Sequence, residues 1–115
     1  MTVTIWHNPK CGTSRKVLDA IHARGVEPRI VLYAQSPPSE REIKSVLKAA
    51  GLAARDLLRR KGTPYEELRL DNPRLTDADL IAAMHEHPLL IERPVVITSK
   101  GARLCRPPER VDEIL

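Results

Sequence analysis

The sequence predicts an α/β fold with a mixed four-stranded sheet, flanked by helices and carrying a helical insertion between the second and third strands. Three observations lead to this prediction. The first third of the 115 residues alternates strand-like, helix-like and strand-like runs. The middle carries helix caps and helical periodicity. The end holds two β-rich runs around a short glycine-containing connection, followed by a proline-initiated helix. No repeat, low-complexity stretch or linker interrupts this order, so we expect one domain over residues 1–115.

The N-terminal part has the pattern of a β-α-β unit. The run "VTIW" at residues 3–6 is rich in the β-branched residues that favour a buried strand. Val17, Leu18 and Ile21 then recur at helical spacing, and Gly25 is a typical residue for ending a helix. The run "EPRIVLYA" indicates a second strand. Such a unit favours two parallel strands joined by a right-handed crossover.

The insertion begins with a strong helix signal. Ser39 followed by Glu42 matches a capping box, and the apolar positions after it form one face that ends at Gly51. The stretch "ARDLLRRKG" then indicates a short helix or helical turn that leads into a loop.

Two further helices are expected in the insertion. Thr63 followed by Pro64 predicts an N-cap with proline at the first helical position. Thr76 and Asp79 predict the start of another helix, which the His-Pro pair at 87–88 ends.

The C-terminal part predicts a hairpin and a last helix. "RPVVIT" and "ARLCR" flank Ser99, Lys100 and Gly101, a connection suited to an antiparallel pair, and "PPERVDEIL" indicates a helix begun by proline. The complete order is that of the thioredoxin-like fold. In that fold a reactive cysteine follows the first strand and a cis-proline precedes the third, which makes Cys11 and Pro94 the matching residues.

Composition excludes several classes of function. Lys and Arg total 19 against 15 Asp and Glu, for a net charge of +4, but aromatic residues are only 3% and no dense basic block occurs. We therefore expect no nucleic acid partner. No apolar run approaches the roughly 18–20 residues that span a bilayer, and the N-terminus lacks a signal-peptide pattern. We expect a cytoplasmic monomer that does not bind membranes.

Cys11 is the strongest candidate for chemistry. A lone cysteine is often a small buried hydrophobe, but the turn-forming and charged residues around Cys11 favour a reactive thiol. A helix N-terminus and nearby positive charge would lower its pKa. Ser14 stands where a C-x-x-C motif has its second cysteine. Its hydroxyl can donate a hydrogen bond to a thiolate but cannot form a disulfide, so an outside thiol or Cys105 must resolve any adduct on Cys11.

Two other kinds of site are not supported. A phosphatase-type C-x5-R loop would need arginine at position 17, which is Val17. His85 and His87 are two residues apart on an expected helix and so point to different faces. We expect no metal at these histidines.

Four segments together resemble the glutaredoxin-coupled arsenate reductases, which have a thioredoxin-like fold. "HNPKCGTSR" is similar to the active-site signature of that family, "LLRRKGTPYEEL" to its central motif, and "ERPVVIT" with "RLCRPPE" to its C-terminal motifs. The resemblance covers essentially the whole chain. It implies that Cys11 is the nucleophile that attacks arsenate and that His7 and Ser14 support its thiolate.

The resemblance also implies three arginines that hold the oxyanion: Arg59, Arg93 and Arg106. Counting back six positions from Tyr65 selects Arg59, and a slip of one position would select Arg60. Guanidinium groups suit this role because they stay protonated and offer forked donors to an oxyanion.

The implied reductants are glutathione, as co-substrate, and a glutaredoxin partner. After Cys11 attacks arsenate, glutathione would reduce the arsenic and leave Cys11 as a mixed disulfide, which glutaredoxin would reduce. The implied cycle needs no metal and no tightly bound cofactor. Cys105 is expected to be a spectator, with a resolving role as the alternative.

Two rival functions stay open because fold alone specifies function weakly. Cys11 with Ser14 also suits a monothiol glutathione-dependent disulfide oxidoreductase without arsenate activity. The fold also occurs in redox-responsive regulators that bind RNA polymerase. Those regulators commonly use a C-x-x-C pair, which Ser14 argues against.

Overall fold

The computed structural model describes residues 2–115, which form two compact units. The first unit contains residues 2–36 and 93–115, and the second contains Pro37–Glu92. The elements of the first unit are β1 (Thr4–Trp6), α1 (Gly12–Ala23), β2 (Arg29–Val31), β3 (Val95–Thr98), β4 (Gly101–Leu104) and the 3-10 helix η3 (Pro108–Glu113). Those of the second are α2 (Glu40–Ala50), η1 (Ala54–Leu57), α3 (Asp77–Glu86) and η2 (Pro88–Leu90). The expected organisation as one domain stays a prediction.

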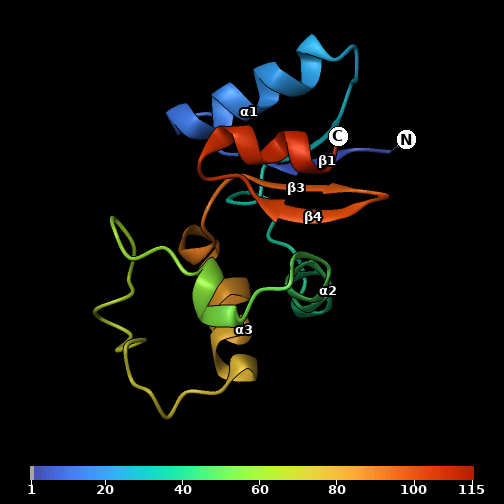
Figure 1. Ribbon diagram of the computed structural model, residues 1–115. Helices are drawn as coiled ribbons and strands as arrows, with labels where there is room; N and C mark the ends of the chain where they lie inside the picture. Colours follow the sequence, from blue (N-terminus) through green and yellow to red (C-terminus); the bar gives the residue numbers. More distant parts are fainter. Residues whose placement is uncertain (1) are drawn as a thin grey trace. The chain divides into compact units, whose positions relative to one another are not determined.

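The first unit is built on a four-stranded sheet in the order β2-β1-β3-β4 (Figure 1). β1 pairs in parallel with β2, with Ile5 opposite Ile30, and antiparallel with β3, with Ile5 opposite Val96. β3 and β4 form the antiparallel hairpin, with Val95 opposite Leu104. The predicted mixed sheet is therefore confirmed, and the helical insertion falls between its second and third strands.

One face of this sheet is covered by α1 and η3 (Figure 1). Their inward side chains and those of the strands form a continuous apolar core: Val3, Ile5, Val17, Ile21, Val96, Cys105, Val111 and Ile114. Burying such side chains contributes about 1.5–3 kcal/mol for each of the larger ones. This packing fixes α1 against the sheet, so that the N-terminus of the helix stays close to the end of β1.

The ends of α1 follow from local sequence. Cys11 has extended backbone angles (φ −95°, ψ 121°) and is the N-cap residue. At the other end Gly25 adopts a positive φ of 73° and donates its N–H to the carbonyl of His22. Only glycine takes this conformation without steric cost, which is why the helix ends there as predicted.

Capping boxes set the two long helices of the second unit. Ser39 accepts from the N–H of Glu42 and begins α2, while Thr76 accepts from the N–H of Asp79 and begins α3, both as predicted. α3 packs against α2 and against η1. An antiparallel bridge between Leu58 and Ile91 joins the two ends of the unit.

The helix predicted at Thr63 and Pro64 is wrong, because residues 61–71 form turns. The hydroxyl of Thr63 donates to the carbonyl oxygens of Arg59 and Arg60. Farther along, the guanidinium of Arg55 binds the carbonyl oxygens of Leu70 and Asn72, at 2.7 and 2.6 Å. The Arg55 contacts come from outside this stretch and hold its last carbonyl groups, so tertiary structure overrides the local helix signal.

Two other elements, the second strand and the last helix, differ in length or type from the prediction. The second strand is only Arg29–Val31, and the following residues form a turn. The "ARDLLRRKG" stretch contains a single 3-10 turn, Ala54–Leu57, which matches the helical turn of the prediction, and the last helix is the 3-10 helix η3. Within residues 2–115, none of the helices has the length and apolarity needed to cross a membrane.

Replacing Thr76 with Ala should lower the free energy of unfolding by about 1 kcal/mol, because the N–H of Asp79 loses its capping acceptor. Chemical denaturation followed by circular dichroism measures this loss. Ser99→Ala, in the exposed turn between β3 and β4, is the matched control and should change stability by less than about 0.5 kcal/mol. Equal effects of the two substitutions would show that the cap of α3 does not contribute.

Candidate active site

Cys11 lies in the loop that joins the end of β1 to the first turn of α1. Its backbone N–H donates to the carbonyl of Asn8 at 3.0 Å, and its carbonyl accepts from the N–H of Arg15 at 3.0 Å. The thiol is partly exposed. Cys11 is therefore held on both sides by backbone hydrogen bonds while its sulfur stays accessible.

Asn8 organises this loop through both its backbone and its side chain. Its Oδ1 accepts from the N–H of Lys10 at 2.9 Å, in the local turn that asparagine commonly forms. Its own N–H donates to Oγ of Ser14 at 3.1 Å. Sequence reasoning did not select Asn8, although the Asn-Pro pair is a turn signal that could have indicated its role.

The pKa of the Cys11 thiol is lowered by groups that outweigh its burial. Partial burial alone raises the pKa, but the Ser14 backbone N–H at the start of α1 interacts with the sulfur and lowers it. The guanidinium groups of Arg93 and Arg106 lower it further. Since the thiolate is the nucleophilic form, this arrangement favours a reactive cysteine.

Arg93 and Arg106 reach the sulfur because of the register of the hairpin. The N–H of Cys105 donates to the carbonyl of Pro94 at 2.9 Å, which continues the β3–β4 pairing by one step. The arginines that flank this pair are therefore neighbours. Nη1 of Arg106 lies 3.9 Å from Sγ of Cys11 and donates to the carbonyl of Arg93 at 3.1 Å. The Arg93–Pro94 peptide bond is cis, and so is the bond between Arg106 and Pro107.

His7 and Ser14 form a buried pair behind the loop. Nδ1 of His7 lies 2.6 Å from Oγ of Ser14, and the two residues are 6% and 0% exposed. Burial lowers the pKa of His7, and the charge of Arg15 lowers it further, so the imidazole is neutral near pH 7. The Ser14 hydroxyl faces His7 and Asn8, and the contact of Ser14 with the sulfur is through its backbone N–H. The Ser14 hydroxyl is therefore engaged with His7 and Asn8, and its role at the thiolate stays a prediction.

Arg59 lies in the second unit and is fixed there by an ion pair. Its Nη1 is 2.9 Å from Oε1 of Glu92, and its Nε donates to the carbonyl of Lys61 at 3.1 Å. The side chains of Arg59 and Glu92 are only 17% and 19% exposed. The neighbouring Arg60 is exposed, pairs with Glu66 and lies over the ring of Tyr65, 5.0 Å from its centroid.

Cys105 has the opposite environment to Cys11. It is fully buried in the core beneath α1 and η3, with its Sγ 3.7 Å from the carbonyl of Arg103. Burial raises the pKa of this thiol to about 12. At neutral pH Cys105 is therefore protonated and poorly nucleophilic.

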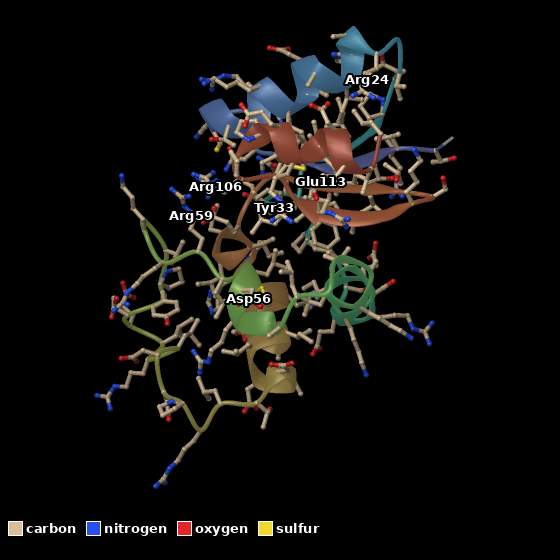
Figure 2. The ribbon with its side chains drawn as sticks, in the orientation of Figure 1. Arg24, Tyr33, Asp56, Arg59, Arg106 and Glu113 are labelled. Carbon is tan, nitrogen blue, oxygen red and sulfur yellow. The ribbon has the colours of Figure 1, made fainter. Side chains whose placement is uncertain are left out.

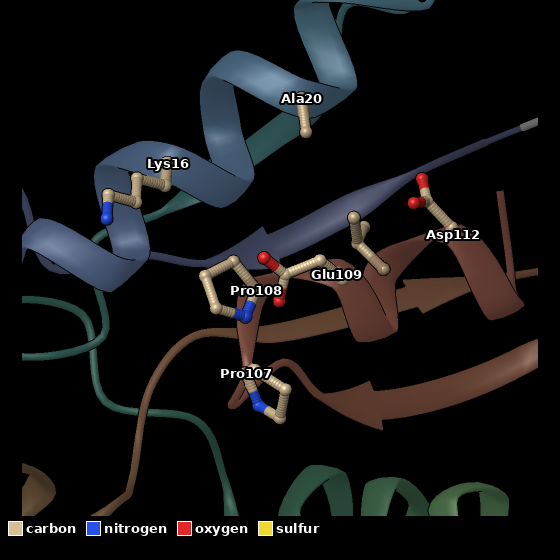
Figure 3. Close-up of a pocket in the computed structure, with 7 residues that line it drawn as sticks. Lys16, Ala20, Pro107, Pro108, Glu109 and Asp112 are labelled. Carbon is tan, nitrogen blue, oxygen red and sulfur yellow. The ribbon is translucent and has the colours of Figure 1, made fainter.

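A groove of about 370 Å³ lies between α1 and η3 (Figure 3). Its lining residues are Lys16, Ala20, Pro107, Pro108, Glu109, Val111 and Asp112. The groove begins beside the two prolines that follow Arg106, but none of the groups that contact the Cys11 sulfur lines it. We assign it no role in the chemistry of Cys11.

The arrangement suits nucleophilic attack on a small oxyanion. The thiolate supplies the nucleophile, and two guanidinium groups beside it supply positive charge and directed N–H donors. Guanidiniums placed in this way can bind an anion and offset its repulsion from the thiolate.

Known proteins with similar sequences and structures carry the name arsenate reductase. One from Rhizobium meliloti (strain 1021) is 52% identical over 115 residues, covering 100% of this chain and 82% of that protein. One from Escherichia coli (strain K12) is 49% identical over 113 residues, covering 98% of this chain and 80% of that protein. The structure of an arsenate reductase from Vibrio cholerae, 45% identical, matches with a TM-score of 0.96 over 100% of this chain and 98% of the other.

These likenesses extend over the whole fold, which confirms the thioredoxin-like arrangement expected from the order of elements. The model of the ArsC family matches residues 6–114, a span that includes the Cys11 loop, the second unit and the hairpin with both arginines. The chain therefore belongs to the ArsC family.

Proposed function

We propose that this protein reduces arsenate to arsenite, with Cys11 as the nucleophile and with glutathione and glutaredoxin as reductants. The observation that carries the proposal is the lowered pKa of a partly exposed thiol that lies 3.9 Å from the guanidinium of Arg106 and beside that of Arg93. Family membership and the names of the relatives support arsenate as the oxyanion.

In the first step the Cys11 thiolate attacks arsenic. A sulfur–arsenic bond forms, and an oxygen leaves as water after taking a proton. The arsenic stays pentavalent. Arg93 and Arg106 offset the repulsion between thiolate and oxyanion, and Arg59 is proposed as a third group that holds the oxyanion.

In the second step the thiolate of glutathione attacks the sulfur of Cys11. The electron pair of the sulfur–arsenic bond passes to arsenic, which becomes trivalent and leaves as arsenite. Cys11 is left as a mixed disulfide with glutathione. Ser14 cannot resolve this disulfide, so the external thiol of glutaredoxin restores the Cys11 thiolate. The cycle uses no tightly bound cofactor.

The environment of Cys105 supports its assignment as a spectator. A resolving thiol must reach the attacked sulfur and must ionise near neutral pH. Cys105 is 0% exposed and has its pKa raised to about 12 by burial. We therefore propose external thiols as the reductants. The protein is proposed to be a monomer that works in the cytoplasm, where glutathione is present.

Cys11→Ser should abolish arsenate turnover, because a hydroxyl at this position does not ionise near neutral pH. The assay follows NADPH consumption through glutathione reductase, with arsenate, glutathione and glutaredoxin supplied. Cys105→Ser is the matched control. The soluble variant should turn over arsenate like the wild-type protein, since the buried thiol takes no part in the cycle.

The same assay separates the proposed function from its main rival. Turnover that needs arsenate, glutathione, glutaredoxin and Cys11 supports the proposal. Cys11-dependent reduction of a glutathione mixed disulfide without arsenate turnover would identify a monothiol oxidoreductase, which Ser14 also suits.

Arg106→Gln should raise the pKa of Cys11, because it removes the guanidinium N–H that lies 3.9 Å from the sulfur and favours the thiolate. A higher pKa means a smaller thiolate fraction at neutral pH, so alkylation by iodoacetamide should slow and its titration midpoint should move to higher pH. The experiment is done in Cys105→Ser to report on one thiol. Arg24→Gln, which removes an exposed arginine paired with Asp112 beyond the far end of α1 (Figure 2), should leave the midpoint unchanged.

Arg59→Lys should lower kcat/KM for arsenate by about tenfold or more, because lysine keeps the charge beside Glu92 but loses the forked donor. Arg60→Lys, at the exposed neighbour, should leave kcat/KM within about twofold. The reverse result would assign the oxyanion contact to Arg60.

A further inference from the structure

Tyr33 is a buried polar residue at the edge of the Cys11 site that the proposed cycle does not yet use. It follows β2 by two residues, and β2 runs parallel to β1, so it lies at the end of the sheet where the Cys11 loop begins. A hydrogen bond from the N–H of His7 to the carbonyl of Val31 continues the β1–β2 pairing to this end of the sheet. The side chain of Tyr33 is 0% exposed (labelled in Figure 2).

The first neighbour of the Tyr33 phenol is a hydrogen-bond donor. Nδ2 of Asn8 lies 3.5 Å from the phenol oxygen. The orientation of this amide is set independently, because Oδ1 of Asn8 accepts from the N–H of Lys10 at 2.9 Å. The side that faces Tyr33 is therefore the NH2 group, and the phenol oxygen accepts.

The second neighbour, the guanidinium of Arg93, also donates only. It lowers the pKa of the Tyr33 phenol as well as that of the Cys11 thiol, which places one guanidinium close to both groups. Burial raises the pKa of Tyr33, and this outweighs the lowering effects of Asn8 and Arg93. The phenol is therefore protonated at neutral pH.

Within residues 2–115 the Tyr33 phenol accepts a hydrogen bond from Nδ2 of Asn8, the Arg93 guanidinium near it can only donate, and no hydrogen bond donated by the phenol is observed. Buried hydroxyl groups normally donate to a partner, and leaving one unmatched is costly. An oxyanion held by Arg93 and attacked by Cys11 would bring an acceptor oxygen to this place.

We propose that Tyr33 binds the substrate, donating a hydrogen bond from its phenol to an oxygen of the arsenate that Arg93 holds. This inference rests on the proposed function and adds a neutral donor to the arginines. The proton stays on Tyr33 throughout, so the residue contributes to binding and orientation and not to proton transfer. Arg93 and Tyr33 would each bind a different oxygen of the ligand. Together they favour an oxyanion with more than one acceptor oxygen.

The test is Tyr33→Phe, which removes the hydroxyl and keeps the ring. Removing a hydrogen bond to a charged acceptor should lower kcat/KM for arsenate by about 10- to 100-fold. KM for glutathione should not change. Tyr65→Phe is the matched control, because Tyr65 is the other tyrosine of the chain and its ring carries the contact with Arg60. It should leave both constants within about twofold.

A second readout separates substrate binding from a structural role. The comparison is between Cys105→Ser and the double variant that also carries Tyr33→Phe, so that Cys11 is the only thiol that reacts. The pH midpoint of Cys11 alkylation should be nearly the same in both. Arsenate should protect Cys11 from alkylation at about 10- to 100-fold lower concentration when the hydroxyl is present. A shift of the midpoint that accounts for the whole loss of activity, or unchanged protection, would overturn the inference.

Failure of the proposed function gives a different pattern. If the wild-type protein shows no arsenate turnover but arsenate protects Cys11, the protection assay alone decides the role of Tyr33. If arsenate neither turns over nor protects Cys11, the proposed function and the inference both fail.

Discussion

The hydrogen bond between the N–H of Cys105 and the carbonyl of Pro94 is the contact on which the site depends. It extends the β3–β4 hairpin one step past its last strand pair. This brings together Arg93 and Arg106, which are 13 positions apart in the sequence. A slip of one residue in the register would turn alternate side chains to the opposite face. The core beneath α1 prevents such a slip, because it buries the side chain of Cys105. Packing on one side of the sheet thus sets the charge beside Cys11.

Two opposing effects act on the Cys11 sulfur, and their balance explains the design of the loop. Withdrawing a thiol from water favours its neutral form, which works against a nucleophile. The backbone N–H of Ser14 and the two guanidiniums more than compensate. The backbone contribution needs no charged side chain, because it comes from the position of Cys11 as the N-cap of α1. Neutral His7 then acts on the sulfur only indirectly, by holding the Ser14 side chain.

The sequence could predict the sheet, the start of each α-helix and Cys11, since these depend on local patterns and caps. The capping boxes at Ser39 and Thr76 are examples, because all their partners lie within three residues. The helix at Thr63 failed, since the turns there are held by Arg55 from a different segment. Tyr33 was missed for the same reason: its significance lies in contacts with Asn8 and Arg93, which no local pattern reveals. Arg93 and Arg106 were selected by family motifs, and their meeting at Cys11 follows from the hairpin register.

The division between charged and neutral donors follows from what the thiolate requires. Each guanidinium near Cys11 lowers the thiol pKa before any substrate binds, so it acts on the nucleophile as well as on the oxyanion. A neutral phenol leaves the charge of the resting thiolate unchanged and becomes useful only when an acceptor oxygen arrives. An interaction made in this way adds to substrate binding without making the sulfur a weaker base and therefore a weaker nucleophile. Tyr33 meets this requirement because burial keeps it protonated, while Asn8 and Arg93 hold its oxygen in place.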